Sequence, residues 1–460
     1  MQLPSDFLTA IKELLGEETS AFKTALEGDS AVSIRLNPYK DIDSDFDLSD
    51  RVQWTQRSFY LDVRPDFVAD PLWHGGAYYV QEASSMFLEQ AVKQYLDTAE
   101  MNTVLDLCAA PGGKSTHLAD LIGKQSLLVS NEVIKSRAKI LSENIQKWGS
   151  GNVLVTCNDP KDIGKIEGFF DLMVVDAPCS GEGMFRKLPH SIKEWSAQNV
   201  KLCAARQKRI LSDVWPALKP DGILIYSTCT YNNQENEENL DWLTEQFDAE
   251  SLPVEFDAEW GVTERSYKGV KGYHFYPHKT RGEGFFIAVI RKTSGKKHKL
   301  PKKRKEHFES PEKKVVQEAE KWIINAKNHR FGQLNDELFV FNRKQYQLFD
   351  YLCGELYVIY AGTKVASITR KGVNPTAALA LSTRLDQDNV KMIEVDQLDA
   401  LRFLKQESIS ETNMPKGWYL ITYKGLGLGW IKALGNRVNN YYPKEWRILM
   451  SWDKLKEKLQ

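Results

Sequence analysis

Short apolar runs alternate with longer amphipathic stretches between about residue 100 and residue 250. The apolar runs are almost continuous and rich in Val, Ile and Leu, which is typical of strands covered on both faces. They are TVLDL (103–107), SLLVS (126–130), NVLVT (152–156), DLMVVD (171–176) and GILIYS (222–227). Helical patterns lie between and after them, at 114–122, 133–148, 196–218 and 235–247. This alternation predicts an α/β fold with a doubly wound, mostly parallel sheet.

The flanking regions follow other patterns. The first 99 residues predict a small α+β extension, with a helix near 5–15 and a strand at 33–36. A strand at 284–292 is expected to close one edge of the central sheet. Farther along, a β-rich region is predicted from segments at 338–342, 355–369 and 418–434, with a helix at 375–384. We therefore expect an extension (1–99), a catalytic domain (100–293), a linker (294–312) and a C-terminal region (313–460).

Charge is distributed unevenly along the 460 residues. The net charge of −1 combines −12 over residues 1–295 with +11 over residues 296–460. Seven of the ten residues 296–305 are Lys or Arg, which we interpret as a solvated linker that can also touch nucleic acid. The acidic N-terminal part and the basic C-terminal part predict a catalytic body joined to a polyanion-binding module. A chain ending near Lys292 is then expected to fold and keep its small-molecule site.

The six cysteines are too few for a disulfide scaffold, and none has the CxxC spacing of a structural zinc site. Neither a signal peptide nor a membrane span is predicted, so we expect a soluble, cytoplasmic protein with reduced thiols. His274 and His278 are four residues apart, but Pro277 between them disfavours a helix, so no metal site is predicted.

A loop of small residues follows the first strand and leads directly into a helix. Small residues let a ligand approach backbone N–H groups at a helix N-terminus. The dinucleotide pattern GxGxxG is absent, and a P-loop would need glycine at Cys108, although Gly113-Lys114-Ser115 and Asp176 would suit an NTPase. The third interpretation is an S-adenosylmethionine loop formed by Cys108, Ala109, Ala110, Pro111, Gly112, Gly113 and Lys114.

Acidic residues follow three successive strands. Glu132 can accept hydrogen bonds from ribose hydroxyls, Asp159 can accept from an adenine amino group, and Asp176 ends the fourth strand. Each acid alone is better explained by a helix N-cap or a surface charge. Together they favour an adenosine ligand over ATP, whose phosphates would be repelled.

Two cysteines, Cys179 and Cys229, follow adjacent strands in small, polar contexts, whereas Cys157, Cys203 and Cys353 are interpreted as buried apolar residues. A thiol beside a methyl donor suits methylation at carbon 5 of a pyrimidine. A thiolate that adds to carbon 6 makes carbon 5 nucleophilic. Asp176 can hold a proton on ring nitrogen 3, and Lys114 can lower the pKa of the attacking thiol.

These strings resemble the Nol/Nop/Sun family of RNA cytosine-5 methyltransferases, and within it the RsmF-like ribosomal RNA enzymes. The resemblance is carried by LDLCAAPGGKST, SNE with Arg137, FFDLMVVDAPCSGEGMFRK and LIYSTCTYNNQENEENL. It extends to SIRLNP, GGAYYVQEASSMFLE, HKTRGEGFFIAV and GLGLGWIKALGNRVNNYYPKEWR.

The resemblance implies a seven-stranded class I methyltransferase fold, a ferredoxin-like N-terminal extension and a PUA-like C-terminal domain. It implies that Cys229 is the nucleophile and that Cys179 assists release. The cofactor, S-adenosyl-L-methionine, would be bound by residues 108–114, Glu132, Arg137, Asp159 and Asp176. The implied partner is RNA, as ribosomal RNA or a small ribosomal subunit, with no membrane and a monomeric enzyme. Transfer RNA as substrate, and a non-catalytic ribosome-assembly factor, stay open as alternatives.

An aromatic and basic group near the C-terminus has two interpretations. These residues stack on RNA bases, or they form a β-domain core with a basic rim. The group comprises Trp430, Tyr441, Tyr442, Lys432 and Arg437.

Overall fold

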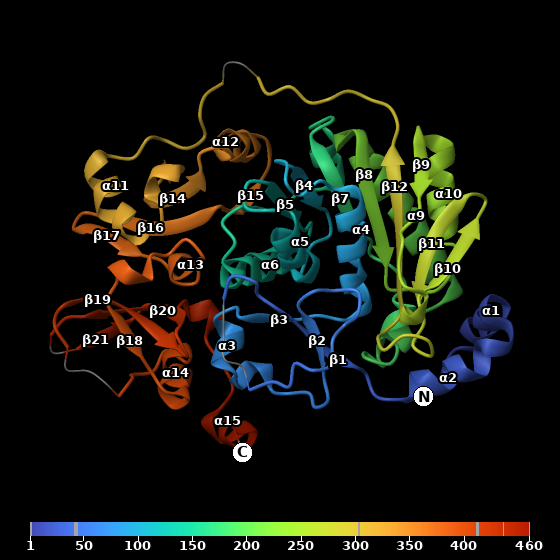
Figure 1. Cartoon of the computed structure of the whole chain (residues 1–460), viewed down its shortest axis with the longest axis horizontal. Coiled ribbons are helices and arrows are strands. Elements are labelled where there is room, and N and C mark those ends of the chain that lie inside the picture. Colours follow the sequence, from blue (N-terminus) through green and yellow to red (C-terminus); the bar gives the residue numbers. More distant parts are fainter. Residues whose placement is uncertain (1, 41–44, 302–303, 411–413, 436, 460) are drawn as a thin grey trace.

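The computed structural model describes residues 2–40, 45–301, 304–410, 414–435 and 437–459. Its centre is a ten-stranded sheet in the described part of the chain, with strand order β10-β11-β12-β8-β7-β4-β5-β6-β15 and β9 paired with β12 (Figure 1). Five strands run parallel: β4 (Thr103–Asp106), β5 (Leu127–Asn131), β6 (Val153–Thr156), β7 (Phe170–Asp176) and β8 (Leu218–Thr228). The predicted doubly wound α/β sheet is confirmed.

One predicted position in this sheet is wrong. Strand β12 (Phe285–Lys292) lies inside the sheet, antiparallel to β8 and β11 (Val270–Phe275), and does not close an edge. Strands β9 (Ala249–Leu252) and β10 (Thr263–Tyr267) lie outside it. Strands β9 and β10 are short or half-exposed, and β11, although mostly buried, is interrupted by Lys271, Gly272 and His274, so the apolar patterns of all three are weak in the sequence. The seven strands from β11 to β6 form the seven-stranded core that the resemblance implies.

Helices cover both faces of this sheet. One core lies under α4 (Leu88–Tyr95), α5 (Gly113–Leu121) and α6 (Lys135–Trp148). The other lies under α7 (Pro160–Gly164), α9 (Ala197–Val214) and α10 (Glu237–Gln246), and the short α8 (Ser191–Glu194) precedes α9. The helix predicted at 196–218 ends earlier than expected, because Pro216 lies in the turn before β8.

The N-terminal region is the predicted α+β extension. Helices α1 (Ser5–Leu15) and α2 (Thr19–Glu27) precede an antiparallel sheet of order β2-β1-β3, with α3 (Pro71–His74) before the last strand. Its strands are β1 (Val32–Leu36), β2 (Ser58–Leu61) and β3 (Tyr78–Val80). The described residues form three strands here, one fewer than a ferredoxin-like βαββαβ unit has. Residues 41–44 lie outside the described part.

The C-terminal region contains two further four-stranded sheets in the described residues. The first consists of β13 (His329–Leu334), β14 (Glu337–Asn342), β16 (Thr363–Thr369) and β17 (Gly372–Pro375); the second of β18 (Met392–Glu394), β19 (Gly417–Tyr423), β20 (Leu426–Ala433) and β21 (Val438–Asn440). Its helices are α11 (Lys313–Ala319), α12 (Tyr346–Glu355), α13 (Ala377–Ala380), α14 (Gln397–Leu404) and α15 (Trp452–Leu459).

One strand of this region leaves it and joins the catalytic sheet. β15 (Val358–Ala361) pairs antiparallel with β6, and the aromatic face of α12 packs into the same core as α7 and α9. The predicted boundary at residue 293 therefore separates segments that share one sheet. Of the basic linker, residues 302–303 lie outside the described residues. In the part of the chain that is described, no helix is long and apolar enough to cross a membrane.

Candidate active site

The loop after β4 and the loop after β7 lie where the strand order of the sheet reverses, since β4 has β5 on one side and β7 on the other. In doubly wound sheets this position binds ligands. Gly112 precedes α5 with φ of 120°, a conformation that suits glycine, and a Cβ there would meet Leu141 Cδ1 at 3.3 Å. The structure thus brings the small-residue loop 108–113 and the N-terminus of α5 to the predicted rim.

Lys114, in the first turn of α5, forms an ion pair with Asp176 at the end of β7. The Lys114 Nζ to Asp176 Oδ2 distance is 2.9 Å, and Ser227 Oγ donates to Asp176 Oδ1 at 2.8 Å. Burial opposes the charge of Lys114, but the neighbouring Asp176 carboxylate outweighs it and raises the pKa of the amine above its usual value. Lys114 is therefore a cation at neutral pH.

The two predicted thiols lie side by side. Cys179 Sγ and Cys229 Sγ are 3.1 Å apart, on the loops that follow β7 and β8. The hydrogen bond to Cys229 raises the pKa of Cys179 well above its usual value, and burial and the nearby Glu235 add to this effect. Cys179 therefore keeps its proton at neutral pH and can donate it to the sulfur of Cys229.

A buried polar network fixes the spacing of the two thiol loops. Glu235, which is 0% exposed, accepts a hydrogen bond from Ser180 N at 2.9 Å, and Ser180 Oγ lies 3.0 Å from Thr230 Oγ1. Gly183 N also donates to Cys229 O at 2.9 Å. Sequence reasoning missed Glu235, although it lies only six residues after Cys229 in the string that carries the resemblance.

The two acids predicted to bind adenosine differ in their surroundings. Glu132 is 3% exposed, accepts from Ile134 N at 2.9 Å and pairs with Arg137 at 3.2 Å. Arg137 also donates to Ala110 O at 2.9 Å, so it ties this acid to the glycine loop. Asp159 instead caps α7 by accepting from Lys161 N at 3.1 Å. The N-cap interpretation of Asp159 is confirmed, and its contact with adenine stays a prediction.

Asp106 is a further acid that sequence reasoning missed. It ends β4, is 0% exposed, and accepts from Ser115 Oγ at 2.7 Å through Oδ2. Its Oδ1 has no hydrogen-bond partner among the described residues. Burial raises the pKa of Asp106 to about 7. An orphaned carboxylate oxygen beneath the loop fits the ammonium group of an amino-acid-bearing cofactor. In the sequence, Asp106 is marked only as an acid within the apolar run TVLDL (103–107).

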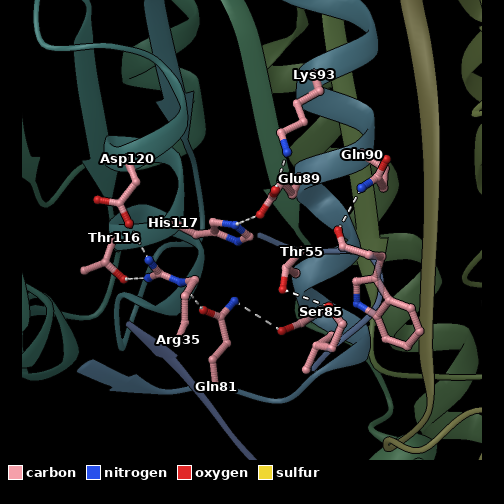
Figure 2. A network of polar contacts seen from close by, with 12 residues as sticks. Arg35, Thr55, Gln81, Ser85, Glu89, Gln90, Lys93, Thr116, His117 and Asp120 are labelled. Atoms are coloured by element: carbon pink, nitrogen blue, oxygen red, sulfur yellow. Dashed lines mark hydrogen bonds and ion pairs between the residues drawn. The ribbon is translucent and has the colours of Figure 1, made fainter. Parts of the chain in front are cut away.

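The N-terminal region holds α5 in place through a buried arginine (Figure 2). Arg35 of β1 donates to Thr116 Oγ1 at 2.6 Å, to Asp120 Oδ2 at 2.5 Å and to Gln81 Oε1 at 3.1 Å. Its guanidinium also lies 4.6 Å from the centre of the Trp148 ring at the end of α6. Beside this cluster, His117 lies 3.0 Å from Glu89 of α4. The helix that carries Lys114 is thus clamped from two sides.

The remaining predicted residues lie away from this rim. Trp430 and Tyr442 are 1% and 2% exposed, and Trp430 Nε1 donates to Thr376 O at 2.9 Å, so the core interpretation is confirmed for both. Tyr441 is 39% exposed and meets the Trp418 ring edge-on at 4.6 Å, which leaves it free to stack on a base.

His274 of the rejected metal pair binds Glu237 at 2.7 Å. No cluster of three or more potential metal ligands occurs among the described residues. Of the other cysteines, Cys203 and Cys353 are buried, as expected, whereas Cys157 is half-buried.

Comparison with known families gives three matches along the chain. The model of the 16S rRNA methyltransferase RsmB/F family matches residues 93–291. The N-terminal domain of 16S rRNA methyltransferase RsmF matches residues 3–83, and the methyltransferase RsmF PUA domain matches residues 390–448.

Curated relatives and solved structures agree with these matches. Ribosomal RNA small subunit methyltransferase F of Aeromonas salmonicida is 33% identical over 96% of this chain and 97% of its own, and that of Shewanella loihica is 32% identical over 90% and 88%. A methyltransferase homolog from Pyrococcus horikoshii is 30% identical with a TM-score of 0.53, covering 63% of this chain and 95% of its own.

NSun6 from the same organism, solved with SFG, shares the fold at 20% identity and a TM-score of 0.53, over 63% of this chain and 98% of its own. These relatives are methyltransferases, so the P-loop NTPase interpretation of Gly113-Lys114-Ser115 is not supported. The fold is that of a class I methyltransferase with an N-terminal domain and a PUA domain. The identity over nearly the whole length shows that the chain belongs to the ribosomal RNA small subunit methyltransferase F family.

Proposed function

We propose that this protein transfers a methyl group from S-adenosylmethionine to carbon 5 of a cytosine in small-subunit ribosomal RNA, through a covalent protein–RNA adduct. The observation that carries the proposal is the pair of thiols 3.1 Å apart beside the Lys114–Asp176 ion pair. A single acid or base would suffice for methylation of an oxygen or an exocyclic nitrogen. A carbon must first be activated by a nucleophile and must later lose a proton to a base, and two adjacent thiols can fill these two roles.

When bound, S-adenosylmethionine supplies the electrophilic methyl group. The loop 108–113 and Asp106 would hold its amino-acid end, and Glu132 would accept from the ribose hydroxyls, with Arg137 fixing the orientation of that carboxylate. Asp159 would contact the adenine. Loss of any one of these contacts should weaken cofactor affinity more than RNA affinity.

The first chemical step belongs to Cys229. As a thiolate it adds to carbon 6 of the ring, and the electrons of the carbon 5–carbon 6 double bond move so that carbon 5 becomes nucleophilic. Asp176 holds a proton on ring nitrogen 3 and offsets the charge that develops there. Lys114 keeps Asp176 in position at 2.9 Å and places a positive charge near the sulfur of Cys229.

Release belongs to Cys179. After methyl transfer, carbon 5 carries both the methyl group and a proton. Cys179 gives up its own proton to water, and its thiolate then takes the proton from carbon 5. The carbon 5–carbon 6 double bond re-forms as the bond between carbon 6 and sulfur breaks, and Cys229 leaves as a thiolate. The raised pKa of Cys179 makes its thiolate a strong base for this proton.

The RNA substrate is supported by the match to a PUA domain, by relatives that are ribosomal RNA methyltransferases and by the +11 charge of residues 296–460. A thiolate mechanism needs reduced cysteines, and we therefore place the activity in the cytoplasm. Transfer RNA and a non-catalytic assembly role remain the alternatives that the experiment must separate.

The test compares two alanine variants on small-subunit RNA. Cys229→Ala should neither methylate nor form an adduct, whereas Cys179→Ala should add, methylate once and stall as a complex that survives denaturing electrophoresis. Cys353→Ala, which removes a buried thiol far from the rim, is the control and should behave as the wild type. Bisulfite sequencing of total RNA with and without the protein identifies the base.

Three outcomes contradict the proposal in different ways. An adduct on Cys229→Ala alone reverses the two roles. Methylation that bisulfite sequencing places only in transfer RNA changes the substrate. Absence of any new 5-methylcytosine with the wild-type protein overturns the reaction itself.

A further inference from the structure

A second cavity lies at the seam between the N-terminal region and the catalytic domain, outside the groups assigned to methyl transfer. Its volume is about 280 Å³. One wall comes from residues 64–80, which include α3 and β3, and the other comes from the second half of α6; Figure 1 shows these elements side by side. The two walls meet tightly, since a Cβ on Gly76 would lie 1.9 Å from Lys147 O.

Aromatic rings and cations line this cavity. Trp73 and Tyr79 are partly exposed in it, and Tyr79 meets the buried Trp148 edge-on at 6.4 Å. Lys147 Nζ lies 4.9 Å from the centre of the Trp73 ring, and the exposed Arg64 stands at the cavity's edge. An aromatic ring beside a cation is the combination that holds a base and its phosphate.

Carboxylates around the cavity are already paired. None of its described lining residues is Asp or Glu. Among acids nearby in the sequence, Glu143 pairs with Lys147 at 2.6 Å, Asp66 pairs with Lys458, and Asp70 accepts from Tyr78. Lys147 and Glu143 offset each other, so Arg64, for which no ion pair occurs among the described residues, is the lining cation left to attract the phosphate of a ligand with an aromatic part.

The cavity also touches the back of the loop predicted to bind the cofactor. Asn144 Nδ2 donates to Pro111 O at 2.8 Å, and the Tyr79 ring lies 3.5 Å from the position that a Cβ on Gly113 would occupy. A ligand that orders Tyr79 and Asn144 would thus also support this loop. A gap that only separates two domains would not need lining side chains that also contact the cofactor loop.

We propose that this cavity binds one nucleotide of the RNA substrate other than the target cytosine. Its base stacks on Trp73 and Tyr79, and its phosphate meets Arg64. The proposal rests on the proposed RNA substrate and gives the N-terminal region a defined contact with it.

The test uses the full chain and a single-stranded RNA that contains the methylated site. Trp73→Ala and Arg64→Ala should each raise the RNA dissociation constant about ten-fold, as expected for losing one stacked base or one phosphate contact. Trp73→Phe, which keeps a ring, should recover most of the affinity. Arg64→Ala should also flatten the salt dependence by about 0.7 log units. The KM for RNA should rise far more than kcat falls.

A matched control separates this contact from general effects. Trp242 on α10 is also partly exposed and has a lysine, Lys208, 5.4 Å from its ring, but it lies far from the seam. Trp242→Ala should leave the RNA affinity unchanged. Ultraviolet cross-linking of bound RNA should label the peptide containing Trp73 and Tyr79, and S-adenosylmethionine affinity should change less than two-fold in all variants.

The outcomes distinguish this inference from the proposed function. If the wild type binds and methylates RNA while Trp73→Ala and Arg64→Ala match Trp242→Ala, the cavity does not bind a nucleotide and the function stands. If Trp73→Phe is as impaired as Trp73→Ala, the ring has a purely structural role and the inference is overturned. If the wild type itself fails to methylate RNA, the proposed function fails first.

Discussion

Replacing Arg35 by Met tests whether the N-terminal region holds the cofactor helix in place. Arg35 is 2% exposed and joins β1 to α5 through Thr116 and Asp120 (Figure 2). Met keeps most of the volume of the arginine stem, so the change removes charge and hydrogen bonds with little cavity formation. What remains is Asp120, buried and without its cation.

The expected cost follows from that orphaned carboxylate. Removing one partner of a buried ion pair destabilises a protein by about 3–5 kcal/mol. Burial raises the pKa of Asp120 to about 7 even though Arg35 opposes the shift. The stability that the protonated Asp120 carboxyl contributes is therefore fully present below about pH 4 and is lost as the pH rises through 7. Without Arg35 the pKa of Asp120 rises further. At pH values above that pKa, each added unit lowers the free energy of unfolding by about 1.4 kcal/mol. Arg35→Met should therefore be more destabilised, relative to wild type, at pH 8 than at pH 6.

Amide hydrogen exchange of α5 and urea unfolding measure this effect, and calorimetry measures S-adenosylmethionine binding. The control is Arg291→Met, whose partner Glu250 lies 2.9 Å away and whose side chain is 37% exposed. An exposed pair of this kind contributes about 0–1 kcal/mol. If the α5 amides are equally protected in Arg35→Met and Arg291→Met at both pH values, with unchanged cofactor affinity, the contacts of Arg35 with Thr116 and Asp120 have no role in positioning the site.

Three further predictions concern the site and the domain division. Glu132→Ala should weaken S-adenosylmethionine binding by about one to two orders of magnitude in calorimetry, because charge-assisted hydrogen bonds contribute about 1.5–3 kcal/mol each; an unchanged constant would remove Glu132 from the site. Asp176→Asn should lower the single-turnover methylation rate about 10²- to 10⁴-fold with RNA affinity nearly intact, and a smaller loss would argue against its role at the ring. A chain ending at Lys292 should lose the cooperative melt seen by circular dichroism and bind cofactor poorly; a native-like melt would contradict this.

The catalytic sheet was predictable because its strands are buried on both faces. The five predicted parallel strands agree with β4 to β8, because continuous Val, Ile and Leu runs leave little choice of register or length. The candidate residues follow from the same fact. Once the strands are known to be parallel, residues after their carboxyl ends must meet at one rim, and Cys179, Cys229, Lys114 and Asp176 do so.

Other features depend on contacts that the sequence does not contain. The position of β12 inside the sheet is set by pairing with strands whose own patterns are weak. In the sequence, Asp106 lies within the pattern of an apolar strand. Only its complete burial and its unpartnered carboxylate oxygen distinguish it. Trp430 and Tyr441 both lie in aromatic, basic surroundings, yet one is buried and the other is exposed, because adjacent segments of a small β-domain present residues to opposite faces.

The charge division along the chain is real, but it does not mark a division into separable parts. Strand β15, which lies in the basic half, completes the edge of the catalytic sheet next to β6. The backbone of Tyr357, just before that strand, accepts a hydrogen bond from Cys157 N and donates one to Asn158 Oδ1, directly before the proposed adenine contact Asp159. The N-terminal region reaches the other side of the same site through Arg35. Because both flanking regions contact the elements of the proposed cofactor site, removing either one should disturb cofactor binding along with RNA binding.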